Sequence, residues 1–150
     1  MSPDDLVGAW SLVDFTLDFS DDRPQVQPFG ASPQGRIVYA ASGHMSAVLS
    51  RSDRAPFSQG GLERGGHATT AQKAQAFDGY LSYAGRWHLE GDEVVHMVQL
   101  ALNPDAVGQH LRRHAGFEDE TLVLTYDLTA RSGVTRHYRL TWRALTTEEN

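Results

Sequence analysis

The residue with the clearest chemical potential in this sequence is a histidine within an apolar run, Val94-Val95-His96-Met97-Val98. Successive side chains of a strand point to opposite faces, so His96 shares a face with Val94 and Val98. Imidazole titrates near neutral pH and often moves protons in active sites. The pattern predicts either a ligand-contacting or acid–base group in an apolar cavity, or a core histidine that is hydrogen-bonded to a neighbour.

The next strand carries basic residues that could face the same space as His96. It follows a turn built on proline, and its two faces hold His110, Arg112 and His114 on one side and Leu111, Arg113 and Ala115 on the other. A charge that faces inward must be paired or must meet an anionic ligand, because a lone buried charge is too costly. The sequence leaves open whether Arg112 or Arg113 faces the cavity. In an enzyme, we expect His96 and Arg112 to be the catalytic pair.

Several other kinds of site are excluded or not indicated. The chain has no cysteine, which excludes a thiol nucleophile, a disulfide framework and a thiolate metal site. His110 and His114 would lie roughly 13 Å apart on a strand that rises about 3.3 Å per residue, so they could not share a metal ion. Ser46 lacks the glycine-flanked elbow of a serine hydrolase. We therefore expect no metal and no cofactor.

The composition of the chain limits the kinds of partner that it can bind. The 150 residues carry a formal net charge of −6, with 40% hydrophobic and 21% charged residues, as in an ordinary globular domain. The negative charge argues against nucleic acid or an anionic membrane as the main partner. No signal peptide is visible, and no run approaches the roughly 20 apolar residues that span a bilayer. We expect one cytoplasmic domain over residues 1–150.

Short alternating runs recur between turn signals. The expected strands are 6–17, 35–41, 44–50, 83–89, 94–102, 110–115, 121–128 and 135–144. One helix is expected at about 70–82, because Thr69 and Gln72 fit a capping box and because Ala74, Phe77 and Leu81 recur at helical spacing as an apolar stripe. We expect this helix to cover the barrel as a lid.

Eight antiparallel strands in chain order are typical of an up-and-down barrel, which encloses enough space for side chains or one small ligand. The fold class is therefore all-β, with a β-sandwich as the alternative. Val95, Met97 and Ala101 fall on the outer face of their strand. Either the helix or a second subunit of a homodimer could cover them.

Several segments, in order, resemble the bacterial and fungal lipocalin-like domain proteins. They are LVGAWSLVDF, GRIVYAASGHMSA, Arg54-Ala55-Pro56-Phe57, AFDGYLSYAG, VVHMVQLALNPDAVGQHLRR and RLTWRA. The resemblance covers nearly the whole chain and implies a calycin-type barrel with an internal cavity. Carried over by position, it implies that the polar site residues are His96 and Arg112 or Arg113, with Tyr39, Ser46, Arg54, Tyr80 and Tyr83 nearby.

With Trp87 as an aromatic lining residue and His110 beside Arg112, these residues form the expected ligand site. The first hypothesis is the binding of a small hydrophobic or aromatic molecule that has a polar handle. The second is a cofactor-independent isomerase or cyclase of a natural-product pathway, in which His96 moves a proton. The third is an interaction protein whose barrel is filled by its own side chains. Haem ligation by His96 is a lesser alternative.

Overall fold

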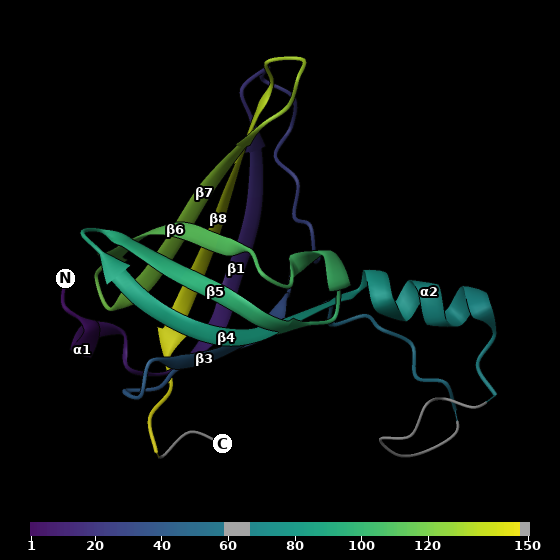
Figure 1. Ribbon diagram of the computed structural model, residues 1–150. Coiled ribbons are helices and arrows are strands. Elements are labelled where there is room, and N and C mark those ends of the chain that lie inside the picture. The colour runs from purple at the N-terminus through teal and green to yellow at the C-terminus, as the bar shows by residue number, and fades with distance from the viewer. Residues whose placement is uncertain (59–66, 148–150) are drawn as a thin grey trace.

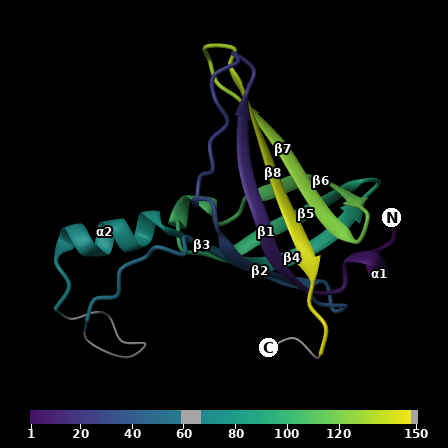
Figure 2. The same cartoon turned by 180° about the vertical axis from the view of Figure 1, so that it is seen from behind.

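The computed structural model of the chain describes residues 1–58 and 67–147. Eight antiparallel strands form one closed barrel (Figures 1 and 2). The strands are β1 (Gly8–Phe19), β2 (Gln34–Tyr39), β3 (His44–Ser50), β4 (Tyr80–Glu90), β5 (Glu93–Ala101), β6 (His110–Glu118), β7 (Thr121–Thr129) and β8 (Thr135–Ala144). The helices are α1 (Pro3–Leu6), α2 (Thr70–Asp78) and a 3-10 turn, η1 (Pro104–Ala106).

Each strand pairs with its neighbours in the sequence, and β1 pairs with β8 to close the barrel. This confirms the up-and-down barrel and excludes the sandwich alternative. Closure leaves no unpaired sheet edge, and alternate residues of every strand face inward. Glycines at the hairpin turns adopt positive φ, for example Gly43 at +84° between β2 and β3. No helix in the described part of the chain is long and apolar enough to cross a membrane.

One end of the barrel is closed by the start of the chain. Leu6, at the end of α1, is fully buried, and Trp10 on β1 is 6% exposed. The indole Nε1 of Trp10 donates to the backbone oxygen of Leu6 at 2.9 Å, which holds α1 against this end. Figure 1 shows α1 and α2 at opposite ends of the barrel. Helix α1 does not cover the end of the barrel near α2 (Figure 1).

Helix α2 begins as expected but does not act as a lid. The side chain of Thr69 accepts a hydrogen bond from the backbone N–H of Gln72, and the side chain of Gln72 accepts one from the backbone N–H of Thr69. The helix ends at Asp78 rather than near residue 82, and it extends away from the barrel (Figure 2). No residue of α2 is buried, and Phe77 is 44% exposed. The expected apolar stripe does not form one helix face, because its last member, Leu81, already belongs to β4.

A close approach between β4 and β5 requires a glycine. A Cβ on Gly85 would overlap the backbone carbonyl of Met97. The pairing of the two strands shifts by one residue between Ala84 and Gly85, and an extra residue of this kind bends the strand that carries it. Gly85 therefore admits a bend in β5 next to the strand segment that holds His96.

We expect Gly85→Ala to lower the free energy of unfolding by about 2 kcal/mol or more, because backbone atoms cannot move aside as a side chain can. Gly116→Ala is the matched control: it also lies in a strand, and its added Cβ would meet only His114 Nε2, at 4.0 Å. It should change the free energy of unfolding by no more than about 0.5 kcal/mol. Urea denaturation followed by circular dichroism measures both. Equal losses in the two variants would contradict this account of Gly85.

Candidate functional site

The centre of the barrel holds a histidine between two tyrosines. His96 on β5 is 1% exposed. Its Nε2 lies 2.7 Å from the hydroxyl of Tyr39 on β2, and its Nδ1 lies 2.8 Å from the hydroxyl of Tyr83 on β4. Both ring nitrogens are therefore occupied, and an iron or other metal ion at His96 would have to displace a tyrosine. The described residues include no group of three or more His, Asp or Glu side chains that could hold a metal ion.

Burial fixes the direction of these hydrogen bonds. Tyr39 is 1% exposed, and among the described residues its hydroxyl has His96 as its one hydrogen-bond partner. A buried hydroxyl proton without an acceptor is costly, so Tyr39 donates to Nε2. The neutral ring then carries its proton on Nδ1 and donates it to the oxygen of Tyr83. The hydroxyl proton of Tyr83 is left free to donate to a further acceptor.

Burial also keeps the three groups uncharged. Desolvation, with the positive charge of Arg113 as a smaller cause, lowers the pKa of His96 to about 3. Desolvation raises the pKa of Tyr83 to about 12, although Arg113 opposes this shift. The pKa of Tyr39 is also raised by burial. At neutral pH the site therefore consists of a neutral imidazole and two protonated phenols.

A cavity of about 60 Å³ lies beside Tyr83 and His96. Most of its wall is apolar and comes from Phe15, Ile37, Ala47, Leu49, Leu81, Leu124 and Leu140. This volume can hold ordered water, whereas pockets for larger ligands occupy about 300–1,000 Å³. Leu81 is 40% exposed, and Tyr83, Arg113 and Tyr126 are half-buried. These four residues mark the mouth of the cavity.

Arg113 brings a positive charge to this mouth. Its guanidinium carbon lies 3.6 Å from the ring centre of Tyr126, and Tyr126 is stacked on Tyr138 at 4.6 Å. Planar guanidinium groups stack well on aromatic faces. The Nη1 atom donates to the backbone oxygen of Arg112 at 3.1 Å. Among the described residues no carboxylate forms an ion pair with Arg113.

A further donor, on another residue that lines the cavity, lacks a partner. Trp142 on β8 is 1% exposed and lines the cavity. Its indole Nε1 is buried and has no hydrogen-bond partner among the described residues. A buried N–H group without an acceptor costs about 1–3 kcal/mol. The cavity wall therefore carries an unsatisfied donor in addition to the free protons of Tyr83 and Arg113.

The structure brings together four of the residues expected from the sequence. Tyr39, Tyr83 and His96 form the hydrogen-bonded chain, and the ring of Trp87 lies 4.9 Å from that of Tyr39. Trp87 is also held by its Nε1, which donates to the backbone oxygen of Ala40 at 3.0 Å. These residues come from β2, β4 and β5, and their inward alternation places them in one space.

The remaining expected residues lie elsewhere. Ser46 and His110 are exposed on the outer face of the barrel. Arg112 is also on the outer face, where its Nη1 lies 2.6 Å from Glu90. Arg112 and His88 together lower the pKa of Glu90 to about 2. The pairing of β5 and β6 explains this placement, because His96 lies opposite Leu111 and Arg113 shares the face of Leu111.

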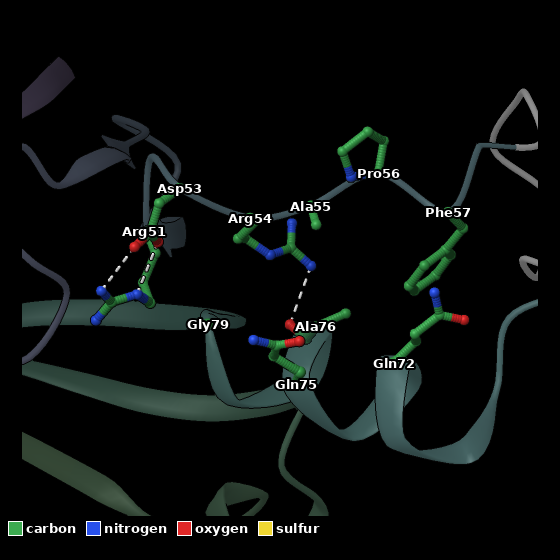
Figure 3. Close-up of a pocket in the computed structure, with 10 residues that line it drawn as sticks. All are labelled: Arg51, Asp53, Arg54, Ala55, Pro56, Phe57, Gln72, Gln75, Ala76 and Gly79. Atoms are coloured by element: carbon green, nitrogen blue, oxygen red, sulfur yellow. Dashed lines mark hydrogen bonds and ion pairs between the residues drawn. The ribbon is translucent and has the colours of Figure 1, made fainter.

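Arg54 lines a separate surface cleft, and Tyr80 lies next to Arg54. The cleft, of about 340 Å³, lies between α2 and the segment that precedes it (Figure 3). Its two cationic groups already have partners. Arg51 is paired with Asp53 at 2.8 Å, and Arg54 donates to the oxygen of Ala76 at 3.0 Å and lies over the ring of Tyr80. The smaller barrel cavity, whose donors are free, is therefore the better candidate site.

Sequence reasoning left the choice between Arg112 and Arg113 open and named Arg112 for the site, and it did not name Tyr126 and Trp142 as site residues. A signal for Arg113 was present, because its face of the strand is shared by the apolar Leu111 and Ala115. Trp142 and Tyr126 fall on the regular apolar faces of β8 and β7. Their alternation predicts an inward position but gives no indication of an unsatisfied N–H.

Comparison with known proteins gives one positive finding. The sequence model of a family described as lipocalin-like domain matches residues 7–145. This range contains all eight strands and every residue of the barrel cavity. No curated protein matches the chain.

The neutral histidine predicts a pH dependence of stability. Unfolded histidine binds a proton below about pH 6.5, whereas folded His96 does so only near pH 3. Stability therefore falls as the pH falls from 6.5, by about 1.4 kcal/mol per unit. We expect a loss of about 2 kcal/mol between pH 7 and pH 5, which chemical denaturation at each pH measures.

The loss should be absent in His96→Gln, which keeps one donor and one acceptor for the two tyrosines. His110→Gln, at an exposed position, is the control and should retain the loss. An unchanged pH dependence in His96→Gln would show that His96 is not the group responsible.

Proposed function

Because the chain belongs to the lipocalin-like domain family, we propose that it binds a small, largely apolar molecule in the accessible half of its barrel. The observation that carries the proposal is the composition of the cavity wall. Apolar side chains surround a few polar groups that converge on one space, which is the usual character of a small-molecule site. The fold is compatible with such binding. The cytoplasmic location and the homodimer expected from the sequence stay predictions.

Access supports the same proposal. The mouth includes Leu81, which lies near the start of β4, directly after α2 and away from the end that Leu6 and Trp10 close (Figure 1). Leu81, at the mouth, is large, apolar and 40% exposed, and an apolar residue in this position can move aside without exposing buried polar groups. A bound molecule would enlarge the existing space of about 60 Å³ by displacing Leu81.

Binding is tested with four probes: cinnamate, cinnamamide, decanoate and decanamide. We expect saturable binding of at least one probe by isothermal titration calorimetry. Ala47→Leu fills the cavity with a buried side chain and should weaken binding at least about tenfold. Ser46→Leu adds the same bulk on the outer face of β3 and should leave the affinity unchanged.

Ala47→Val provides a smaller addition if Ala47→Leu does not fold. The proposal is wrong if the wild-type protein binds none of the probes, or if a folded Ala47→Leu protein binds them as well as Ser46→Leu does. Either result would favour a barrel that is filled by its own side chains.

One observation favours an isomerase or cyclase as the second candidate function. The free hydroxyl group of Tyr83, held in place by His96, could donate a hydrogen bond to the enolate oxygen that develops when a base from solvent removes the proton next to a substrate carbonyl. Because both nitrogens of His96 are occupied, Tyr83 rather than His96 would contact the substrate. His96 would act as the residue that positions Tyr83.

Phenylpyruvate, an aromatic keto acid that enolises slowly, tests this alternative. We expect the protein to accelerate deuterium incorporation next to its carbonyl group in D₂O, as followed by NMR. Tyr83→Phe should abolish the acceleration, since it removes the donor and little volume. A rate equal to that in buffer, with binding shown separately, would leave the protein a binder without this activity.

A further inference from the structure

We infer that the barrel cavity takes an organic anion, namely an apolar molecule that ends in a carboxylate held by Arg113 and Tyr83 at the mouth. The inference rests on the proposed binding function and names the class of ligand. It is carried by three features of the cavity: its free donors outnumber its free acceptors, its cation has no carboxylate partner among the described residues, and that cation is held in place before a ligand arrives.

The cavity wall offers more free donors than free acceptors. The acceptor nitrogen of His96 is taken by Tyr39, and its N–H is taken by Tyr83. What remains is the proton of Tyr83, the N–H groups of Arg113 that the backbone does not use, the Nε1–H of Trp142, and the hydroxyl of Tyr126, which can donate as well as accept. A ligand group that only accepts satisfies these donors, and an ionised carboxylate is such a group.

The charge of Arg113 also calls for a negative partner. Four other arginines of the described chain, Arg23, Arg51, Arg112 and Arg139, each form an ion pair with a carboxylate. Arg113 forms none there, although it is half-buried next to an apolar cavity. A cation in such surroundings is stabilised by an anion that replaces the lost water. Arg113 therefore differs from these arginines in being available to a ligand.

The guanidinium of Arg113 is already positioned. The stack on Tyr126 and the hydrogen bond to the oxygen of Arg112 limit its movement. Less freedom is then lost when a ligand binds. A guanidinium matches the planar geometry of a carboxylate, and one cation balances the single charge of that group. A phosphate monoester would bring up to two charges to a cavity with one cation, so we favour the carboxylate.

The test compares each carboxylate with its neutral amide: cinnamate with cinnamamide, and decanoate with decanamide. We expect the wild-type protein to bind the carboxylate of at least one pair about tenfold more tightly, which corresponds to about 1.4 kcal/mol. Arg113→Gln should remove this preference and leave the binding of the amide in place. Arg112→Gln loses the same charge one residue away, on the outer face, and should keep the preference.

The outcomes separate the two proposals. Equal binding of carboxylate and amide by the wild-type protein overturns the inference and leaves the proposed function standing. A preference that survives in Arg113→Gln, or that is lost in Arg112→Gln alone, also overturns it. Failure of all four probes overturns the proposed function itself. If Arg113→Gln does not fold, Arg113→Lys keeps the charge but loses the planar fork, and the preference should then fall several-fold.

Discussion

The interior of this barrel depends on two hydrogen bonds to one uncharged histidine. They join β2 and β4 to β5 through His96, so three strands contribute to one polar chain in an apolar surrounding. Hydrogen bonds are strong where water is excluded, and a missing partner there is correspondingly costly. The chain also has a direction, because Tyr39 is too deeply buried to donate anywhere else. That direction gives Tyr83 its free proton and gives the cavity its donor character.

The sequence predicts the barrel and the inward position of His96, but it does not predict the choice between Arg112 and Arg113. Alternation along one strand shows which of its residues share a face. This was enough to place His96 on the same face as two valines. To predict which arginine faces the cavity, the register between β5 and β6 must be known. That register depends on the length and shape of the connection between the two strands. Leu111 and Ala115 pointed to Arg113, yet the polar face that contains Arg112 looked equally suited to a site.

The helix shows a different limit of sequence reasoning. The capping box at Thr69 is a local signal and is confirmed in detail. The packing of Phe77 depends on where the helix ends and in which direction the chain continues. The apolar spacing that suggested a longer helix runs into Leu81, which belongs to a strand. Local hydrogen bonds were therefore predictable, whereas the contact between α2 and the barrel was not.

The closure of one end of the barrel by Leu6 and Trp10 has a kinetic consequence. Because one end of the barrel is closed, a molecule that occupies the cavity must enter and leave through the same mouth. Any barrier at that mouth is crossed in both directions, so a side chain that obstructs the passage without touching the bound molecule slows association and dissociation by the same factor. For the ligand proposed above, substitution of such an obstructing side chain would change the residence time without changing the affinity, which the residues that hold the ligand determine.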